Sequence, residues 1–515
     1  MRLEPCSRPP HLAAIPANMV CSLTYRMLPI SALDETSNSP LYRQLYLKIK
    51  QLIESHQLSK GDRLPATREL AGQLGLNRTT VSAAYELLES EGLITGHVGR
   101  GSFVADPISK RTQLNWSDVL EPGTQSQAAP ASTPLASFSS SRPSELLFPL
   151  EEFRSSCAEV IESPEAQTIL QLGSPSGYAP LRRYLLEASR AEGLARDTDD
   201  ILITSGCQQT VDLLQRTLAR NGETVLLEDP VYLGVRHVFE RGGARLMGVP
   251  VGDHGLDLEA LERMLTRERP KLLVVTPNFQ NPTGATIPLA SRKALLRITQ
   301  AAGVIVVEND IYGPLAYEGD SLAPLKRLDE TGDTVLLRSF SKLAFPGLRV
   351  GWVIGPRPLI EKLTEAKQWS DLHTDQLSQA VLLRFAESGR LEQHRQRMLT
   401  AGRERLHAVL GACEKYLPPG TTFTRPRGGM SLWVRLPGGL DAGELLPRAE
   451  REGVTYLPGK YFAVSHPQPN SLRISFAGMS PDQIRSGVAI LGRIFQNELE
   501  RMRAHSPLIE APAMV

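Results

Sequence analysis

Residues 40–90 carry apolar positions at the spacing of amphipathic helices. The first predicted helix has one apolar stripe, made of Leu41, Leu45, Ile49 and Leu52. Gly61 and Asp62 follow this helix, and a second helix is expected over residues 67–74. Asn77 is a favourable N-cap for a third helix, whose stripe is formed by Val81, Ala84, Tyr85 and Leu88. Two short helices joined by a three-residue turn predict a helix-turn-helix.

A glycine-rich hairpin is predicted directly after the third helix, between the β-like runs 93–95 and 102–104. The hairpin tip contains Gly99, Arg100 and Gly101. One arginine on such a tip suits contact with a minor groove or with the DNA backbone. The first turn of the third helix contains Arg78, Thr79 and Thr80, where a recognition helix reaches bases or phosphates. The alternative is a small helical packing domain that carries a hairpin.

Three segments show no sustained periodicity. Residues 1–36 are rich in proline, and we expect a disordered extension or an upstream start site, because Met27 directly precedes the first patterned stretch. Residues 106–142 shift in composition to Ser, Pro, Ala, Thr and Gln, which is typical of a semi-extended linker between domains. Residues 506–515 are expected to form a tail.

Short β-rich runs alternate with helical patterns from residue 143 to 505. The runs are residues 201–204, 225–227, 272–276, 304–307 and 335–337. Strands that alternate with helices usually form a mostly parallel sheet with helices on both faces, so the pattern predicts an α/β domain. Residues 143–358 are assigned to a large domain. Residues 359–505 are assigned to a smaller lobe, with strands near 430–436 and 472–475.

Composition limits the function. The 515 residues exceed a single hydrophobic core, and the formal net charge of +1 requires any DNA-binding surface to be local. The five cysteines are dispersed, without a CxxC pair or a histidine at metal-ligand spacing, which indicates a reducing compartment and no metal site. No apolar run reaches the roughly 18 residues of a membrane helix. No continuous apolar segment suggests a signal peptide, so a cytoplasmic location is expected.

The candidate chemistry centres on one lysine, Lys342, which follows the apolar run 335–337. Ser339 and Ser341 flank it, and Arg349 comes seven residues later. A lysine in a pocket that lowers its pKa can form a Schiff base with pyridoxal phosphate. Two hydroxyl groups and a guanidinium group could hold the cofactor's phosphate. The alternative is an ordinary surface lysine after a strand.

Polar motifs follow other predicted strands, at the sheet edge where such folds bind ligands. A helix is expected to begin near Thr210, and the turn before it could bind phosphate through Gly206, Cys207 and Gln208. Tyr232 could stack on a flat ring, and the amide of Asn281 could bond a phenolic oxygen. Another strand ends with Asn309, Asp310 and Tyr312. Each motif alone is weak evidence, but their order together favours one shared site.

In this order the motifs resemble those of fold-type I pyridoxal-phosphate aminotransferases, from about Phe148 to the last helix. The resemblance implies that Lys342 forms the Schiff base and that Tyr232 stacks on the ring. It also implies that Asn281 bonds the cofactor's O3′, with Tyr312 beside it. It assigns the phosphate to Gly206, Cys207, Gln208, Ser339, Ser341 and Arg349.

The same resemblance assigns the substrate side of the site. Arg473 would clamp the α-carboxylate of an amino acid; the alternative for it is a surface arginine on a strand. Gly177 and Tyr178 would lie in a loop that closes over the substrate.

One position departs from the family's pattern. The family places a carboxylate three residues before the tyrosine, where it keeps the pyridine nitrogen protonated. Three residues before Tyr312 this chain has Asn309, whereas Asp310 stands two residues before it. If the register is strict, an asparagine faces the ring nitrogen and proton abstraction at Cα would be poor. If the strand end shifts by one residue, Asp310 serves.

The N-terminal pattern resembles the winged helix-turn-helix of GntR-type regulators, through the strings GDRLPATRELAGQLGLNRTTVSAAYELLESEGLI and GRGSFV. The resemblance implies that residues 37–105 bind a double-stranded DNA operator. It assigns the DNA contacts to Arg68, Arg78, Thr79, Thr80, Gly99, Arg100 and Gly101. Binding through such a local face should weaken with salt.

A winged helix-turn-helix, a linker and an aminotransferase-like body resemble the MocR-type regulators of the GntR family. The resemblance implies an α/β protein whose body has the fold-type I transferase architecture, with a mostly parallel sheet of the seven-stranded type. It implies a transcription regulator that binds pyridoxal phosphate at Lys342, responds to an amino compound or to the cofactor itself, and forms a homodimer. Two alternatives are a working aminotransferase with an accessory DNA-binding head, and a DNA-binding protein with an empty body.

Overall fold

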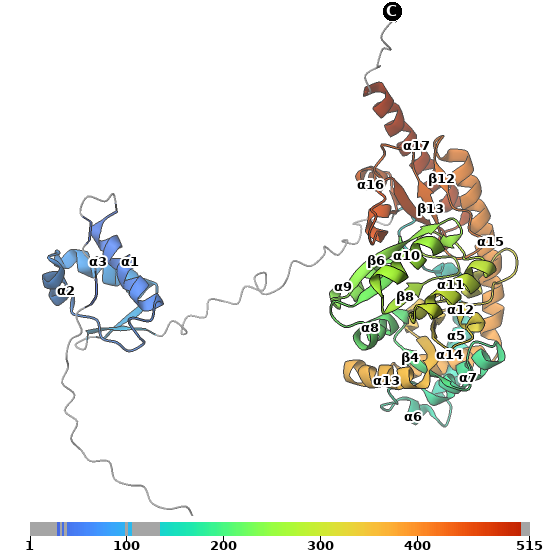
Figure 1. Ribbon diagram of the computed structural model, residues 1–515, viewed down its shortest axis with the longest axis horizontal. Helices are drawn as coiled ribbons and strands as arrows, with labels where there is room; N and C mark the ends of the chain where they lie inside the picture. Colours follow the sequence, from blue (N-terminus) through green and yellow to red (C-terminus); the bar gives the residue numbers. More distant parts are fainter. Residues whose placement is uncertain (1–27, 31–32, 35–38, 98–100, 106–133, 506–515) are drawn as a thin grey trace, which may run out of the picture. The chain divides into compact units, whose positions relative to one another are not determined.

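The computed structural model describes residues 28–30, 33–34, 39–97, 101–105 and 134–505 (Figure 1). The chain divides into two compact units, Met1–Ala128 and Ala129–Val515, which we call the head and the body. Most of the expected N-terminal extension, most of the expected linker and the whole expected tail lie outside the described residues.

The head contains the three predicted helices followed by the predicted hairpin. Its elements are α1 (Leu41–Glu54), α2 (Thr67–Leu74), α3 (Arg78–Ser90), β1 (Ile94–His97) and β2 (Gly101–Val104). The predicted apolar stripes meet in one core, in which Leu45, Ile49, Val81 and Leu88 are fully buried. The hydroxyl of the buried Tyr85 donates to the carbonyl of Pro65, which ties α3 to the segment before α2.

The body is built on an eight-stranded sheet of order β4-β11-β10-β9-β8-β5-β6-β7. In chain order the strands are β4 (Asp199–Thr204), β5 (Thr224–Asp229), β6 (Arg245–Gly252), β7 (Gly255–Leu256), β8 (Leu272–Val275), β9 (Ile305–Asn309), β10 (Thr334–Ser339) and β11 (Gly351–Pro356). The five strands from β10 to β6 are parallel, whereas β11 and β7 pair antiparallel with their neighbours. The sheet is therefore mostly parallel, as predicted, and β7 adds a short eighth strand.

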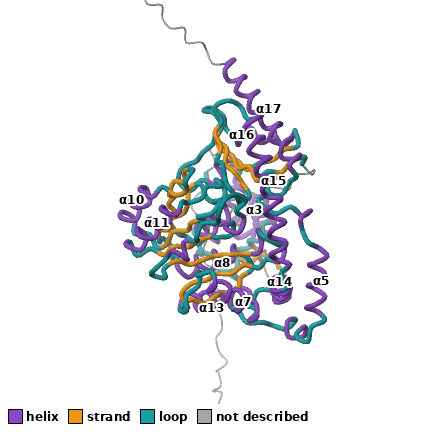
Figure 2. Tube along the Cα trace, turned by 90° about the vertical axis from the view of Figure 1, so that its right-hand side faces the viewer, coloured by secondary structure: helices purple, strands orange, loops and turns teal. Residues whose placement is uncertain are grey.

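Helices cover both faces of this sheet. Val225 and Leu227 point to a core under α8 (Cys207–Leu218), α9 (Leu233–Arg241) and α13 (Arg357–Asp371), while Leu226 points to the opposite core. The opposite face is covered by α10 (Leu258–Glu268), α11 (Leu289–Ala301) and α12 (Leu325–Leu328). Figure 2 shows α10 and α11 beside the strands. Because both faces are buried, the strands read as continuous apolar runs.

A smaller lobe follows, with a four-stranded sheet of order β12-β13-β16-β15. Its elements are β12 (Thr422–Phe423), β13 (Ser431–Arg435), α16 (Ala442–Arg451), β15 (Leu457–Pro458), β16 (Ser471–Ser475) and α17 (Pro481–His505). The long helix α15 (Arg390–Tyr416) packs along α17. Three further helices, α5 (Leu150–Ile161), α7 (Ala179–Ala191) and α14 (Gln376–Glu387), pack together next to β4.

The body begins earlier than the sequence suggested. Strand β3 (Ala136–Ser137) pairs parallel with β14 (Val454–Thr455), and the amide of the fully buried Phe138 donates to the carbonyl of Thr455 at 2.8 Å. The predicted linker boundary at residue 142 is therefore too late. It was missed because only two apolar residues anchor this serine-rich segment. We call residues 136–142 the strap.

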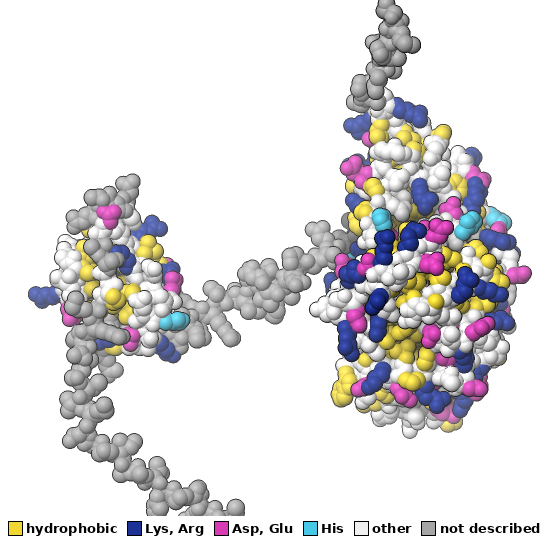
Figure 3. All heavy atoms as spheres, viewed as in Figure 1, with side chains coloured by type: hydrophobic (Ala, Val, Ile, Leu, Met, Phe, Trp, Pro, Cys, Tyr) yellow, Lys and Arg dark blue, Asp and Glu magenta, His cyan; other side chains and the backbone are white. Residues whose placement is uncertain are grey.

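Charge and hydropathy add little to this picture. On the face of the body seen in Figure 3, Lys and Arg side chains are interspersed with Asp and Glu. Within the described ranges, no helix is long and apolar enough to span a membrane. The same residues hold no cluster of three or more His, Cys, Asp and Glu side chains that could bind a metal ion.

Candidate DNA-binding face and cofactor cavity

The helix-turn-helix of the head has the geometry that its sequence predicts. Gly75 ends α2 in the left-handed conformation, with φ of 68°. The side chain of Asn77 caps α3 by accepting a hydrogen bond from the amide of Thr79 at 3.2 Å. Arg78 and Thr79 are exposed in the first turn of α3, and Thr80 beside them is partly exposed. This turn is free to approach a nucleic acid.

The wing is only partly described. β1 and β2 pair antiparallel, from Ile94 opposite Val104 to His97 opposite Gly101. The tip residues Gly99 and Arg100 lie outside the described residues.

Two arginines lie near the elements of this face. Arg68 is exposed on α2. Arg63 borders the wing, since a Cβ on Gly101 would lie 3.2 Å from its Nε. Sequence reasoning missed Arg63, because it falls in a turn without periodicity. Its position two residues before Pro65 is the only local feature of the sequence that marks the turn in which it lies.

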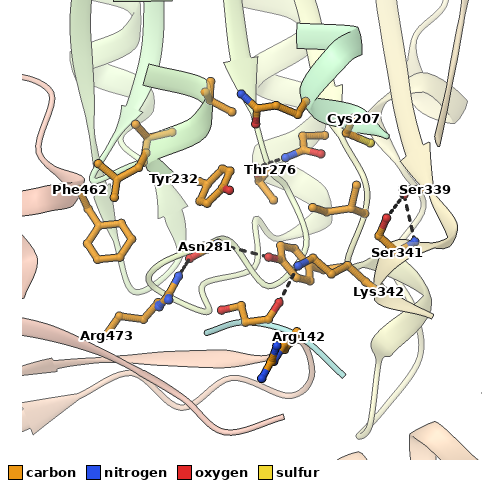
Figure 4. A pocket seen from close by; sticks show the side chains of 18 of the residues that line it. Arg142, Cys207, Tyr232, Thr276, Asn281, Ser339, Ser341, Lys342, Phe462 and Arg473 are labelled. Atoms are coloured by element: carbon orange, nitrogen blue, oxygen red, sulfur yellow. Dashed lines mark hydrogen bonds between the residues drawn. The ribbon is translucent and has the colours of Figure 1, made fainter. Parts of the chain in front are cut away.

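The predicted cofactor residues of the body meet around one cavity of about 400 Å³ (Figure 4). Those that line it are Cys207, Gln208, Tyr232, Asn281, Asn309, Tyr312, Ser339, Ser341, Lys342, Arg349 and Arg473. They come from the carboxyl ends of the parallel strands and from β16 of the smaller lobe. The cavity lies between the large domain, which holds the eight-stranded sheet, and the smaller lobe, which holds the four-stranded sheet. Its volume is that of an ordinary small-molecule site.

Lys342 reaches into the cavity from the 3₁₀ turn after β10. Its Nζ donates to the carbonyl of Ser141 at 2.6 Å and lies 5.7 Å from the centre of the Tyr312 ring. Burial lowers the pKa of Lys342 to about 8, and the Arg473 guanidinium acts in the same direction. With this pKa about a tenth of the amine is neutral at pH 7 and about half at pH 8, and the neutral form is the nucleophile.

A set of donors lies where α8 begins. α8 starts at Cys207 rather than near Thr210, because Gly206 turns the chain with φ of 82°. A Cβ on Gly206 would lie 2.3 Å from the Nη2 of Arg349, so only glycine leaves room for this guanidinium. Ser339 accepts a hydrogen bond from the amide of Ser341 and donates to its hydroxyl, at 3.0 and 2.9 Å. Hydroxyls, a guanidinium and a helix N-terminus together suit a phosphate.

A hydrogen-bonded chain joins the two domains across the cavity. Arg473 donates to the Oδ1 of Asn281 at 3.0 Å, and the Nδ2 of Asn281 donates to the hydroxyl of Tyr312 at 3.3 Å. Burial lowers the pKa of Arg473 to about 10, so it stays charged at neutral pH. Its Nε is buried and has no protein partner. A cation held in this way can bind a carboxylate.

The strap forms one wall of the cavity, and sequence reasoning missed it. Arg473 donates to the carbonyl of Ser139, just as Lys342 donates to that of Ser141. The hydroxyl of Ser141 also lies 3.0 Å from that of Ser475 on β16. The run of three serines before Arg142 reads as linker composition, so the sequence carries no pattern that places it in a site.

The structure decides between the two registers at the end of β9. Asn309 lines the cavity, and its buried Oδ1 has no protein partner. Asp310 does not line it; its carboxylate accepts from Asn278 at 2.9 Å and from Arg338 at 2.9 and 3.0 Å. The strict register therefore holds, and the assignment of Asp310 to the cofactor site is wrong. Its partners hold this carboxylate away from the cavity.

The predicted substrate loop lies elsewhere in the single chain. Gly177, with φ of 105°, packs against Ile203 of β4, and the amide of Tyr178 donates to Gln379 of α14 at 2.8 Å. Neither residue lines the Lys342 cavity. Other lining residues were not predicted, among them Glu228, Thr276 and Phe462. Phe462 lies 5.2 Å from the Arg473 guanidinium, a contact between distant segments that local motifs do not reveal.

The residues present fit pyridoxal phosphate, the group expected from the sequence. Two buried polar atoms of the cavity, Asn309 Oδ1 and Arg473 Nε, lack protein partners. The glycine at 206 leaves space beside Arg349, and a neutral amine is available on Lys342. A planar ring with a phosphate at one end and an aldehyde near its centre matches this donor set.

Two family models match the chain. Residues 144–491 match the family described as aminotransferase class I and II, and residues 41–104 match the bacterial regulatory proteins of the gntR family. The uncharacterized HTH-type transcriptional regulator YdfD of Bacillus subtilis is 30% identical over 477 residues, which cover 90% of this chain and 98% of that protein. The probable rhizopine catabolism regulatory protein MocR of Rhizobium meliloti is 28% identical over 481 residues, covering 90% and 95%.

A solved structure resembles the body. LysN, an α-aminoadipate aminotransferase from Thermus thermophilus that is complexed with N-(5′-phosphopyridoxyl)-L-leucine, superposes with a TM-score of 0.70 at 36% identity. The match covers 75% of this chain and 100% of that one. The remaining part of this chain includes the head.

Removing the Arg78 side chain should weaken DNA binding. We expect Arg78→Ala to lower the affinity for an operator by about 10- to 100-fold, since one specific contact contributes roughly 1–3 kcal/mol. Fluorescence anisotropy with labelled DNA at fixed salt measures the loss. Arg43→Ala, at an exposed arginine of α1, is the matched control and should change affinity little. Equal losses in both variants would contradict the assigned face.

Proposed function

The chain belongs to the MocR-type regulators, which join a GntR-family head to an aminotransferase class I and II body, and we propose that its body is a receptor for an amino compound. The head is a DNA-binding domain, and the protein is a transcription regulator. Pyridoxal phosphate is the cofactor that the aminotransferase-type body implies. The observation that carries the proposal is the Lys342 amine, neutralised in part by burial and bonded to the strap.

The proposed roles follow the cavity's contacts. When bound, pyridoxal phosphate supplies an aldehyde that condenses with a primary amine. Lys342 would hold the cofactor covalently, and Arg349 with the hydroxyls of Ser339 and Ser341 would hold its phosphate. Tyr232 would cover the ring. Arg473, anchored through Asn281, would take the α-carboxylate of an amino acid.

The strap offers a route from the cavity to the head side of the chain. The carbonyls of Ser139 and Ser141 accept from the two cations that an amino acid would engage. The carboxylate of an amino compound would take Arg473 away from Ser139, whereas an amine that takes the place of Lys342 on the cofactor would return the Lys342 amine to Ser141. The contacts of the strap would then differ between the cofactor-loaded and the amine-bound protein. Because the strap stands at the N-terminal start of the body in the sequence, this change would alter operator binding.

We also propose a homodimer, for which an exposed apolar patch gives the support. Leu170 and Leu172 are exposed next to Gln171, whose carbonyl accepts from Gln376 at 2.8 Å. Trp369, at 83% exposed, and Leu372, at 57%, lie just before Gln376. Figure 1 shows α13 and α6 (Ala166–Ile169) at the same end of the body. Large exposed apolar side chains in one region mark an interaction site.

We propose that a second copy of this chain covers the patch. Residues 173–178, which include the predicted substrate loop, directly follow Leu172 of the patch in the sequence. Since this loop does not reach its own cavity, a partner subunit that supplies Gly177 and Tyr178 would complete the site. A two-fold dimer would also present two heads to two operator half-sites.

A working aminotransferase is the second candidate. Lys342, Asn281 and Arg473 share one cavity, as a transaminase requires. A panel of amino acids tested with 2-oxoglutarate separates the two functions. Sustained turnover near the enzyme median of about 10 per second would favour the enzyme.

Cofactor loading and operator affinity test the proposal together. The loaded full-length protein should show an absorbance band that shifts when an effective amino compound is added, and its operator affinity should change over the same titration. The rate of cofactor uptake should rise from pH 6, reach about half of its maximum near pH 8 and level off above about pH 9, because the pKa of Lys342 is lowered to about 8 and only the neutral amine attacks.

Lys342→Ala is the control, and it should lose the band and the response while it retains operator binding. An operator affinity that no amine or cofactor alters would count against the proposal, even if the band forms.

Disrupting the apolar patch should separate the subunits. We expect Trp369→Asp to convert a dimer into a monomer, because a buried carboxylate in an apolar interface is strongly unfavourable. Light scattering after size-exclusion chromatography measures the mass. Leu289→Asp, at an exposed leucine of α11 outside the patch, should leave the dimer intact. A wild-type monomer would refute the dimer itself.

A further inference from the structure

The carbonyl oxygen of an amide faces the cavity at the end of β9. Asn309 is 9% exposed and lines the cavity, with its Oδ1 buried and unpartnered. Its Nδ2 makes one long hydrogen bond, of 3.5 Å, to the hydroxyl of Thr276. The amide therefore has unused capacity directed at whatever occupies the cavity, and it carries no charge.

The neighbouring carboxylate cannot take its place. Asp310 is 1% exposed and accepts two hydrogen bonds from Arg338 and one from Asn278. Arg338 is held in turn by Glu192 at 3.0 Å. Turning Asp310 toward the cavity would break both of its hydrogen bonds with the partly buried Arg338 guanidinium, which would keep only Glu192 as an acidic partner.

The remaining wall of the cavity supplies positive charge. Lys342, Arg349, Arg473 and Arg142 line it, and the pKa values of Cys207 and Tyr312 are each raised to about 12 by burial, so neither is an anion at pH 7. Tyr232 is the other phenol on this wall. Glu228 is the only carboxyl among the described lining residues. Burial raises its pKa to about 8, and it accepts from the Thr276 amide and from Gln280, so it is mainly neutral.

We propose that Asn309 leaves the ring nitrogen of bound pyridoxal phosphate unprotonated at neutral pH, which makes the body a receptor that retains amino compounds with little conversion. The inference rests on the proposed function, because it assumes that Lys342 holds the cofactor. Removal of the Cα proton leaves an electron pair that a protonated ring nitrogen stabilises. The single 3.5 Å bond to Thr276 lets the amide turn, so that Nδ2 rather than Oδ1 faces the ring nitrogen and donates to its unprotonated form. Because the amide is neutral, it does not attract a proton to that nitrogen.

The expected effect is large. A carboxylate within about 4–6 Å raises the pKa of a cationic partner by about 1–3 units, so its absence lowers the protonated fraction of the ring by about 10- to 1000-fold. The rate of Cα proton removal should fall with that fraction. Covalent capture of the amine does not need the ring proton and should persist.

The test uses the full-length protein loaded with cofactor that is labelled with ¹⁵N in its ring. The nitrogen chemical shift distinguishes a free pyridine from a protonated one and does not depend on turnover. We expect the free-pyridine shift in the wild type at pH 7, with and without an added amino acid. Asn309→Asp should move the signal to the protonated position and increase exchange of the Cα proton with D₂O by about 10-fold or more.

Asn309→Ser, which is also neutral, is the matched control and should keep the free-pyridine shift. A protonated nitrogen in the wild type would overturn the inference, and this measurement decides even if Asn309→Asp fails to fold. If amines still alter operator affinity in that case, the proposed function survives alone. A protein that retains no labelled cofactor at Lys342 would remove both.

Discussion

The hydrogen bond from the Lys342 amine to the Ser141 carbonyl is the contact on which this account depends. It gives the reactive amine a partner inside a cavity whose burial lowers its pKa to about 8. It also ties that amine to the segment through which the chain enters the body. The same nitrogen is the one proposed to bind the cofactor covalently, so the cofactor and the strap compete for it.

Arg473 of the smaller lobe also bonds to the strap. This side chain, carried on β16, reaches Asn281 of the large domain and the carbonyl of Ser139 in the strap. A carboxylate bound there would act on both lobes and on the strap at once. Asn309 places no charge where an aminotransferase is expected to have a carboxylate. Under the proposal, a site without that charge binds amines covalently but removes their Cα proton slowly.

Local patterns predicted much of this structure. Runs such as 225–227 identified doubly buried strands, and Asn77 and Gly75 located the helix-turn-helix, because these signals depend on neighbouring residues alone. Other features depend on contacts between distant segments. The strap has the composition of a linker and is fixed by distant segments, namely β14, β16, α17 and the cavity. The choice between Asn309 and Asp310 rests on a single step of strand register, which turns a side chain to the opposite face. Gly177 and Tyr178 belong to the family's pattern but do not line the cavity of their own chain.

Hydrogen–deuterium exchange of the strap tests the central claim most directly. The Phe138 amide donates to Thr455 and should be protected in the cofactor-loaded protein. Adding an amino compound that alters operator affinity should change the exchange of peptides covering residues 136–142, and it should have no effect in Lys342→Ala. Unchanged exchange in the wild type, at amine concentrations that do change operator affinity, would contradict the account.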